Sequence, residues 1–304
     1  MAEARPTRSQ PLVSVLTPSF GQARWLEDNL RSVEAQTYGP IEHIVMDGGS
    51  TDGSVGILER RSRDGLIWTS EPDDGQSDAI NRAFARSSGQ IIGWLNSDDA
   101  YFSRKAVAQA VAVFESRPDV GVVYGHAALV NGDGLLLHVI WAPAFAPSVL
   151  RAYDLICQPT LFVRRSVIGR PDFVDPAFGY SMDWELLLHL ARRTRFFRMN
   201  QIVAIDRHHL DRKSLTRLDL AAEDQQLIVQ RYRTPAIASN PVLHKATKVA
   251  IRLAGLSKVV EAARGSDMLS LQTGSVSEIA IRQVAQLRRW MSSGDPRESS
   301  ETEL

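Results

Sequence analysis

One run of residues decides how this chain folds, and it reads Ile91-Ile92-Gly93-Trp94-Leu95-Asn96-Ser97-Asp98-Asp99. Its apolar part predicts a buried strand, and its polar part stands at the carboxyl end of that strand. An open α/β sheet builds its ligand site along this edge. Neighbouring carboxylates repel each other unless a cation lies between them, so Asp98 and Asp99 are a candidate metal and diphosphate site. The alternative is a cap with first-turn acids for a helix expected at 104–116.

Strand-like and helix-like patterns alternate on both sides of this run. Strands are predicted at 12–16, 41–46, 66–69, 91–95 and 120–124, and helices at 25–36, 55–63, 77–87 and 105–115. Nearly continuous apolar strands separated by helices predict a mainly parallel sheet that is covered on both faces. In such a sheet the polar clusters that follow the strands meet at one edge. These clusters are residues 17–19, 47–53, 71–75 and 96–99.

The pattern is less regular after Gly125. Apolar stretches at 135–141, 160–163 and 196–205, a helix at 182–193 and a polar loop at 206–216 complete the expected elements. We therefore predict one catalytic domain over 11–225, divided into halves at 11–125 and 126–225. A basic helical extension is expected at 226–291, with disordered polar tails at 1–10 and 292–304.

Composition limits the function classes. The 304 residues carry 35 Lys plus Arg and 35 Asp plus Glu, so no net field attracts nucleic acid. The single cysteine, Cys157, excludes an internal disulfide and a thiolate metal cage, which suits a reducing compartment. No apolar segment resembles a signal peptide or approaches the roughly 20 residues that span a bilayer. We expect a cytoplasmic protein, in solution or peripheral at the inner face of the membrane.

Four motifs occur in a characteristic order: Thr17-Pro18-Ser19-Phe20, then 46–54, then 70–81, then Trp94 to Asp99. Each is weak alone, but together they resemble glycosyltransferase family 2 over roughly residues 11–217. The resemblance implies an inverting, nucleotide-sugar-dependent enzyme with the GT-A fold, a Rossmann-like central sheet flanked by helices. It also implies that 11–125 binds the nucleotide sugar and that 126–225 binds the acceptor.

The nucleotide pocket is expected at the ends of the first strands. Asp47 precedes Gly48-Gly49, where the backbone lets a ligand approach closely, and its carboxylate can accept a hydrogen bond from a base; a turn is the alternative. The resemblance implies that Asp47 contacts the base and that Asp78 and Asn81 lie beside the ribose and diphosphate. The full set expected to bind the nucleotide sugar is Thr17, Pro18, Ser19, Asp47, Gly49, Asp78, Asn81, Asn96, Asp98, Arg207, Lys213 and Ser214.

Asp98 and Asp99 are similar to the Asp-x-Asp metal motif of the family, with Asn96 where the first aspartate often stands. A neutral amide can bind ribose but is a poor ligand for a hard cation, so Mn²⁺ or Mg²⁺ is expected on Asp98 or Asp99. His209 is the candidate third ligand. It lies in a loop whose Arg207 and Lys213 are expected to pair with the diphosphate; a solvated polar loop is the alternative.

Inverting transfer also needs a base that deprotonates the acceptor hydroxyl. Asp183 opens a predicted helix and resembles the acidic catalytic motif of the family, with helix capping as the alternative function. Glu185 is the alternative base. Gln158 and Trp184 are expected to face the acceptor.

Two features lie beyond the catalytic domain. The run from Gln286 to Trp290 matches a signature of processive polysaccharide synthases, but those enzymes usually span membranes, and a surface helix is the interpretation we favour. The basic stretch at 226–264 either contacts anionic lipid, which suits a lipid-linked acceptor, or packs on the catalytic domain or on a second subunit in a homodimer.

The sequence thus predicts a metal-dependent inverting glycosyltransferase. The donor is a nucleoside diphosphate sugar, UDP-linked first and GDP- or dTDP-linked next, and the acceptor is a saccharide or a lipid-linked saccharide in bacterial surface polysaccharide or glycolipid assembly. One alternative is a sugar-1-phosphate nucleotidyltransferase, which the run Thr17-Pro18-Ser19-Phe20 disfavours because it is not a glycine-rich basic phosphate loop. The other is a non-catalytic nucleotide-sugar-binding or scaffold protein.

Overall fold

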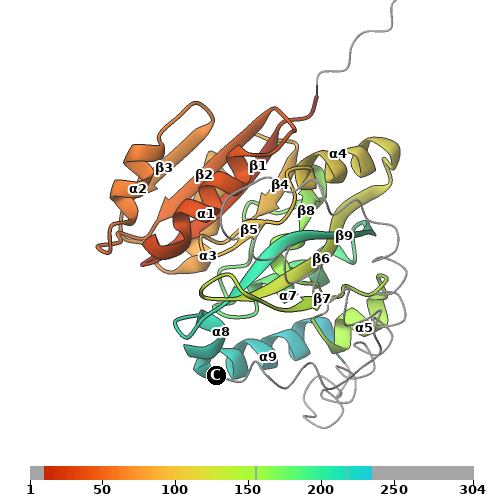
Figure 1. Ribbon diagram of the computed structural model, residues 1–304. Helices are drawn as coiled ribbons and strands as arrows, with labels where there is room; N and C mark the ends of the chain where they lie inside the picture. The colour runs from red at the N-terminus through yellow and green to blue at the C-terminus, as the bar shows by residue number, and fades with distance from the viewer. Residues whose placement is uncertain (1–9, 155, 217, 235–304) are drawn as a thin grey trace, which may run out of the picture.

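The computed structural model describes residues 10–154, 156–216 and 218–234, which form a central sheet with helices on both faces (Figure 1). The strand order is β3-β2-β1-β4-β8-β6-β9-β5, with β7 paired to β6. In Figure 1, β1 to β3 lie at one end of the molecule with α1 and α2, and α5, α8 and α9 lie at the other.

The first four strands are parallel, as the sequence predicts. They are β1 (Val13–Ser19), β2 (Ile41–Asp47), β3 (Leu66–Ser70) and β4 (Ile91–Trp94). The helices between and after them are α1 (Ala23–Glu34), α2 (Ser54–Arg61), α3 (Gln76–Arg86) and α4 (Ala106–Ser116). Predicted and observed ends differ by a few residues at most.

Alternation along each strand explains why both faces are covered. Val45 of β2 packs against Leu26 of α1 and Leu58 of α2, whereas its neighbour Ile44 packs in the cluster that contains Ile80 of α3. Successive side chains of a strand point to opposite faces, so an apolar strand needs a helix layer on each side.

The second half of the sheet is mixed rather than mainly parallel. Its strands are β5 (Ala100–Tyr101), β6 (Val120–Asn131), β7 (Leu136–Ile140), β8 (Phe162–Arg164) and β9 (Arg195–His208). Strand β8 runs antiparallel to β4 and β6, β7 is antiparallel to β6, and β5 is antiparallel to β9, whereas β6 and β9 are parallel. Local sequence patterns predict strands but not their direction, so this mixture was not predicted.

Helices and turns complete the second half: α5 (Pro147–Ala152), the 3₁₀ helix η1 (Gln158–Thr160), α6 (Arg165–Ile168), α7 (Met182–Leu190), α8 (Lys213–Thr216) and α9 (Leu218–Tyr232). The expected polar loop at 206–216 therefore begins as the end of β9 and ends as α8. Helix α9 continues through position 225, where we expected the catalytic domain to end.

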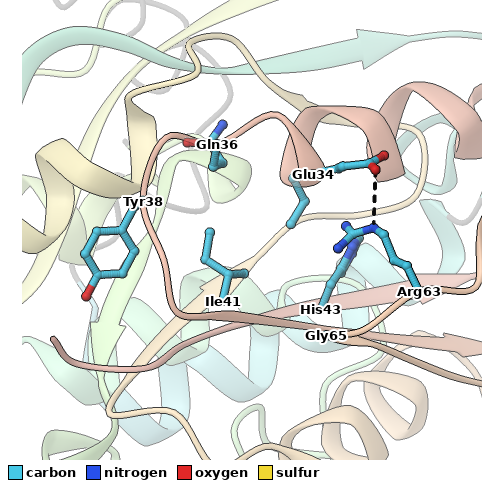
Figure 2. A pocket seen from close by; sticks show the side chains of 8 residues that line it. Glu34, Gln36, Tyr38, Ile41, His43, Arg63 and Gly65 are labelled. Carbon is cyan, nitrogen blue, oxygen red and sulfur yellow. Dashed lines mark ion pairs between the residues drawn. The ribbon is translucent and has the colours of Figure 1, made fainter. Parts of the chain in front are cut away.

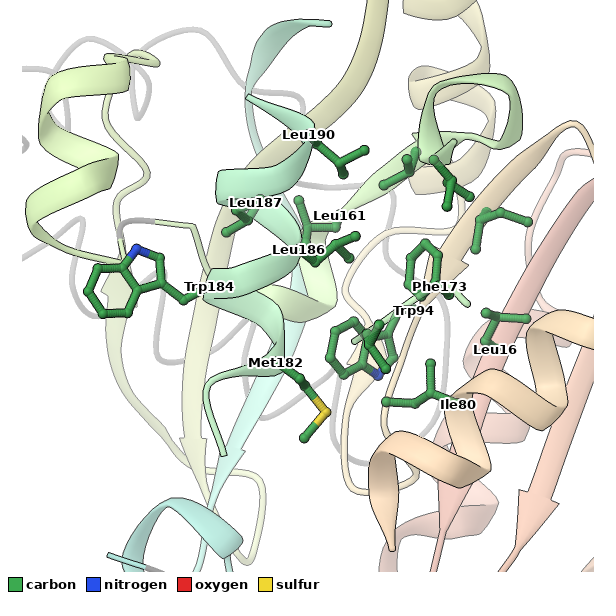
Figure 3. Close-up of a cluster of buried hydrophobic side chains, with 14 of the residues drawn as sticks. Leu16, Ile80, Trp94, Leu161, Phe173, Met182, Trp184, Leu186, Leu187 and Leu190 are labelled. Atoms are coloured by element: carbon green, nitrogen blue, oxygen red, sulfur yellow. The ribbon is translucent and has the colours of Figure 1, made fainter. Parts of the chain in front are cut away.

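Helix α7 sits on the main hydrophobic core. Its residues Met182, Leu186 and Leu187 belong to a buried cluster that also holds Trp94 of β4 and Ile80 of α3 (Figure 3). The core thus fixes α7 against the sheet next to the end of β4. The candidate base Asp183 lies in the first turn of this helix.

The tails, most of the expected basic extension and the run from Gln286 to Trp290 lie outside the described residues. Within the described ranges, every helix is too short or too polar to cross a bilayer.

Candidate active site

The polar clusters that follow β1 to β4 do meet at one edge of the sheet. In the parallel register Ser19 of β1 lies beside Asp47 of β2, Asp47 lies beside Ser70 of β3, and Leu16 lies beside Trp94 of β4. The four strands therefore end side by side, and this part of the prediction is confirmed.

The two carboxylates after β4 face different ways. The Asp98 Oδ2 atom lies 3.0 Å from His209 Nε2, and the Asp98 side chain keeps 11% of its exposure. Asp99 is more deeply buried, and its Oδ1 atom accepts a hydrogen bond from the Arg207 backbone N–H at 3.1 Å. Burial and the charges of Asp98 and Asp206 raise the pKa of Asp99 well above its usual range. The geometry favours Asp98 over Asp99 as a cation ligand.

Arg207 supports the Asp98 loop through hydrogen bonds. Its side chain is 1% exposed; Nε donates to the Asp98 backbone carbonyl at 2.9 Å, and a terminal nitrogen donates to the Asp28 carboxylate at 3.1 Å. Strand β9 extends three residues further than expected and includes Arg207. Arg207 thus fixes the backbone that presents Asp98, and its expected pairing with the diphosphate stays a prediction.

His209 is oriented from two sides. Its ring packs on Trp25 with centroids 3.9 Å apart, and Trp25 is held by a hydrogen bond from Nε1 to the Gly132 carbonyl at 2.9 Å. The Nε2 atom faces Asp98, whereas Nδ1 is buried without a hydrogen-bond partner among the described residues. A ring held in this way keeps one nitrogen at the acidic loop.

Asp98 and His209 fit a divalent cation. Ligand atoms about 2.1 Å from an octahedral Mg²⁺ lie about 3 Å from each other, which is the separation of these two atoms. Among the described residues, no group of three or more His, Cys, Asp or Glu side chains is arranged to hold a metal ion. Such a cation commonly takes one or two protein ligands and completes its shell with phosphate oxygens and water.

Asn96 belongs to a network of amides rather than to an open ribose site. Its Oδ1 atom accepts hydrogen bonds from Trp94 Nε1 at 2.9 Å and Gln76 Nε2 at 3.0 Å, and its Nδ2 atom donates to Gln158 Oε1 at 2.9 Å. Gln158 in turn donates to the Trp94 carbonyl at 2.6 Å. The predicted roles of Asn96 and Gln158 in ligand contact are not supported. An amide suits this position because it must donate and accept at once.

Lys213 reaches this network from α8. Its Nζ atom donates to Gln76 Oε1 at 3.0 Å, which places a cation two hydrogen bonds from Asn96. Ser214 follows in the same helix, and its side chain lies outside the part of the chain that the structure describes. Lys213 therefore stands near the acidic loop, as we expected.

Residues expected to line the nucleotide pocket form hydrogen bonds with other residues of the protein. Asp47 accepts from the Ser50 N–H at 2.9 Å, from the Ser50 hydroxyl at 2.6 Å and from the Ser70 hydroxyl at 2.6 Å. Thr17 is buried, with Oγ1 2.9 Å from His43 Nε2. Both side chains therefore have hydrogen-bond partners within the protein. The partners of Asp47 fit the turn interpretation and do not exclude a contact with a base.

Ser19, Phe20 and Gly48 are the remaining candidates for ligand contact at this edge. Ser19 Oγ is buried without a partner among the described residues, and Pro18 before it is a buried strand residue. Phe20 is 70% exposed. A Cβ atom on Gly48 would lie 2.8 Å from Asp73 Oδ2 and 3.2 Å from Phe20, so these two side chains converge on Gly48.

Phe20 and Asp73 are candidate contacts that the sequence analysis did not assign. Both lie within the quoted motifs, shortly after the end of a strand, and this position in the sequence could have identified them. Burial raises the pKa of Asp73. Gly49 has a φ of +83°, which favours glycine in this turn, as expected.

Asp78 and Asn81 of α3 have structural partners. Asp78 pairs with Arg82 at 2.7 Å and accepts the Asp74 N–H at 3.1 Å. Asn81 donates to the Val174 carbonyl at 2.9 Å and accepts the Val174 N–H at 3.0 Å, which ties α3 to the segment before α7. The expected ribose and diphosphate role is not supported for Asn81, because the side chain is committed to this clamp.

Asp183 lies in the first turn of α7, and Oδ1 accepts the Trp184 N–H at 2.9 Å. Burial raises the pKa of Asp183, although the charges of Lys213 and Arg212 oppose this shift. Asp154, which the sequence analysis missed, lies close to it. Burial and the charge of Asp183 raise the pKa of Asp154 well above its usual range.

Glu185 and Trp184 point away from this site. Glu185 is 1% exposed, pairs with Arg170 at 2.8 Å and accepts a hydrogen bond from the Tyr232 hydroxyl at 2.5 Å. Trp184 is buried, and its Nε1 atom donates to the Leu150 carbonyl at 2.7 Å. Successive helical residues are rotated by about 100°, so the neighbours of Asp183 enter the core. Glu185 as the alternative base and Trp184 as an acceptor contact stay predictions, and these contacts favour neither of them.

The loop after β9 adds two charged residues that were not assigned. Arg212 pairs with Asp206 at 2.8 Å. The charges of Asp99 and Asp98 act on the same guanidinium, and Arg212 also acts on Asp183. Arg212 therefore interacts electrostatically with both the acidic loop after β4 and the first turn of α7.

A separate pocket of about 170 Å³ lies away from this edge, where α1 ends and β2 begins (Figure 2). It is lined by Val33, Glu34, Gln36, Tyr38, Ile41, His43, Arg63 and Gly65. Burial and the charge of Arg63 lower the pKa of His43 to about 3, so this ring is neutral and links the pocket wall to Thr17.

An α/β sheet with an acidic loop after its fourth strand and a helix that carries an aspartate beside it defines a glycosyltransferase of the GT-A fold. A mannosyltransferase of Pyrobaculum calidifontis, solved with GDP-mannose and Mn²⁺, superimposes with a TM-score of 0.56 at 18% identity, over 94% of this chain and 84% of that one. TarS of Staphylococcus aureus gives 0.55 at 16% identity, over 71% of this chain and 39% of that one. The fold prediction is thus confirmed.

The chain belongs to glycosyl transferase family 2, whose model matches residues 14–165. An uncharacterized glycosyltransferase of Mycobacterium tuberculosis is 34% identical over 60% of this chain and 70% of its own length. A PGL/p-HBAD biosynthesis glycosyltransferase of Mycobacterium bovis is 24% identical over 77% of this chain and 94% of its own length. The resemblance noted from the motifs is confirmed, and the protein is a transferase.

Proposed function

We propose that the protein is an inverting glycosyltransferase that uses Mn²⁺ or Mg²⁺ to move a sugar from a nucleoside diphosphate sugar to a hydroxyl acceptor. One observation carries the proposal: the Asp98 carboxylate lies 3.0 Å from His209 Nε2, and Arg212 interacts electrostatically both with Asp98 and with Asp183 in the first turn of α7. A cation site and a base on opposite sides of a sugar are what in-line displacement at an anomeric carbon requires.

The donor is expected to lie over the ends of β1, β2 and β3. Exposed Phe20 offers an aromatic face for the base, and Ser19 Oγ and Asp73 offer hydrogen-bonding atoms beside it. The fold neighbours solved with UDP and GDP-mannose support a nucleoside diphosphate sugar as the donor class. UDP remains the first candidate and GDP or dTDP the next.

Asp98 and His209 would hold the cation, and Lys213 would add a second positive charge beside the diphosphate. The ion, when bound, supplies charge neutralisation for the departing diphosphate. Arg207 keeps the Asp98 backbone in place, and Trp25 keeps the His209 ring in place.

Asp183 would accept the proton of the acceptor hydroxyl as that oxygen attacks. Burial and the charge of Asp183 raise the pKa of Asp154 well above its usual range, and burial raises the pKa of Asp183 while Lys213 and Arg212 oppose that shift. We therefore assign the base role to the ionised Asp183 carboxylate and not to Asp154. Burial strengthens the basicity of Asp183, because water stabilises the charged form less.

The acceptor is proposed to be a saccharide or a lipid-linked saccharide used in bacterial surface glycolipid or polysaccharide assembly, on the cytoplasmic side of the membrane. The name of the mycobacterial PGL/p-HBAD relative supports a glycolipid setting. A hydroxyl acceptor suits a carboxylate base of the kind that Asp183 provides.

Calorimetric titration with UDP, GDP, dTDP and CDP, each with and without Mn²⁺, tests the donor site. We expect one nucleotide to bind in a Mn²⁺-dependent manner and Asp98→Ala to lose that dependence. Asp133→Ala is the matched control, because Asp133 is exposed and pairs only at the surface with Arg24. Mn²⁺-independent binding that Asp98→Ala leaves unchanged would refute the proposed cation site.

Turnover separates the alternatives. A glycosyltransferase releases a nucleoside diphosphate from a nucleotide sugar, whereas a sugar-1-phosphate nucleotidyltransferase releases pyrophosphate from a nucleoside triphosphate. Binding without either product across a broad acceptor panel would favour the non-catalytic scaffold.

A further inference from the structure

A buried carboxylate of helix α9, that of Asp224, contacts the loop before α7. Asp224 is 3% exposed and accepts hydrogen bonds from the backbone N–H groups of Tyr180 and Ser181, both at 2.6 Å, and from that of Gly179 at 3.4 Å. The residues joined in this way lie 43 to 45 positions apart in the sequence. A charged acceptor makes these hydrogen bonds stronger than neutral ones.

This contact fixes the residues that lead into α7. Ser181 is the N-cap residue of α7, and its own side chain makes no capping hydrogen bond. Asp224 accepts the Ser181 backbone N–H together with those of the two residues before it, whereas an N-cap side chain would accept from the second or third helical residue. Asp224 therefore holds the N-cap residue from another helix, and its negative charge beside the start of α7 is favourable.

Other contacts hold α9 in place. A Cβ atom on Gly179 would lie 3.2 Å from Leu220 Cδ1, so the loop passes close against α9. Towards the other end of α9, Ile228 packs in the main core and anchors the helix. The Tyr232 hydroxyl also donates to Glu185, but Glu185 keeps its pair with Arg170 at 2.8 Å without that hydrogen bond. Asp224 is the residue of α9 that binds the loop backbone.

Ser181 precedes Asp183 by two residues, so the position of the loop sets where the Asp183 carboxylate points. We propose that Asp224 is a positioning residue for the reaction: it fixes the loop 179–181 and thereby holds the proposed base Asp183 toward the acceptor. The inference rests on the proposed function, because it takes Asp183 as the base. Asp224 itself touches neither donor nor acceptor.

The test compares Asp224→Asn with Tyr232→Phe. The first replaces the charged acceptor by an amide that keeps one oxygen; the second removes a hydrogen bond between α9 and α7 without touching the loop. With UDP-glucose, UDP-N-acetylglucosamine and GDP-mannose, each with Mn²⁺, nucleoside diphosphate release by Asp224→Asn should fall about 10- to 100-fold in kcat, because small misplacements of a catalytic group cost that much. KM for the donor and nucleotide affinity should stay unchanged, and Tyr232→Phe should keep kcat.

Hydrogen exchange of the full chain tests the clamp without turnover. The Tyr180 and Ser181 amides should exchange faster in Asp224→Asn than in Tyr232→Phe. Gly179→Ala, which presses on Leu220 and leaves Asp224 intact, should show the same direction of change, and it replaces Asp224→Asn if that variant fails to fold. Equal kcat and equal exchange in Asp224→Asn and Tyr232→Phe would overturn the inference.

The two proposals fail in different ways. If the wild type releases no nucleoside diphosphate from any donor, the proposed function fails, and the exchange comparison still decides whether Asp224 orders the loop. If the wild type turns over and Asp224→Asn matches the control, the function stands and the positioning role is refuted.

Discussion

In the half of the sheet built from β1 to β4, candidate residues stand at strand ends and are placed by the parallel register, as Ser19 beside Asp47 illustrates. In the half built around β6, β8 and β9, they are held by side chains from distant elements: Arg207 under the Asp98 loop, and Asp224 at the start of α7. The first arrangement follows from short-range patterns. The second depends on polar contacts between segments far apart in the chain.

The difference predicts how each half responds to substitution. A residue at a strand end can change with little effect on the strand, because the register depends on the backbone and on apolar packing. A buried polar clamp cannot lose one member without leaving its partner unpaired, which costs stability and moves the residues that it holds.

The largest effect is expected from Asp183→Asn. An amide cannot accept the acceptor proton, so kcat should fall by about 10²- to 10⁴-fold. Mn²⁺-dependent nucleotide binding, measured by calorimetry, should remain. Glu185→Gln is a poor control because Glu185 is buried in an ion pair, whereas Asp175→Asn removes a surface-side pair with Arg231 on the segment before α7. Full activity in Asp183→Asn would eliminate it as the base.

Arg207→Met tests the clamp beneath Asp98. It removes the hydrogen bonds to the Asp98 carbonyl and to Asp28, so we expect a loss of about 2–4 kcal/mol in the free energy of unfolding. Denaturant titration measures the loss, and Mn²⁺-dependent nucleotide binding should weaken with it. Arg195→Met, which breaks an exposed pair with Asp119, should cost less than about 0.5 kcal/mol. Equal costs in the two variants would contradict the clamp.

Asn96→Asp tests why position 96 carries an amide where the acidic motif of the family often has an aspartate. A carboxylate would face Gln158 Oε1, and the donor to that atom would be lost, so we expect destabilisation of about 1–3 kcal/mol. Asn131→Asp is the matched control, because Asn131 Oδ1 accepts hydrogen bonds from the backbone N–H groups of Asp133 and Leu135, which a carboxylate accepts equally well. Thermal unfolding of the two variants gives the comparison, and a stable Asn96→Asp with better metal binding would mean that the network is dispensable.

The smallest effect is expected from Asp154→Asn, read from the pH dependence of kcat. Burial raises the pKa of Asp183, and the base acts in its ionised form, so transfer should be lost as pH falls through a value above the ordinary Asp pKa of about 3.9. Burial and the charge of Asp183 raise the pKa of Asp154 well above its usual range and so favour its neutral form, which an amide imitates, so the plateau rate should stay within about twofold and the acidic limb should be preserved. A collapse of kcat would assign part of the base role to Asp154.

Sequence patterns located the strands of the first half, the polar edge, the Asp98 loop, the first turn of α7 and the region of Lys213. They did not show that Arg207, Glu185 and Trp184 are buried, because one or two residues of register decide whether a side chain faces the site or the core. They also missed Asp154 and Asp224. These two residues are recognised by their proximity to Asp183 and its loop in the folded chain, and not by the sequence around them.

By itself the sequence determined the alternating α/β framework and the family, because apolar periodicity and strand-end chemistry are local properties that survive without knowledge of the fold. Only the tertiary structure decided which of Asp98 and Asp99 faces outward, why Asn96 is an amide, and which carboxylate holds the N-cap residue of α7. Those outcomes depend on partners tens of residues away. A buried polar group settles where its donors and acceptors are satisfied, and that condition can be read only once the chain has folded.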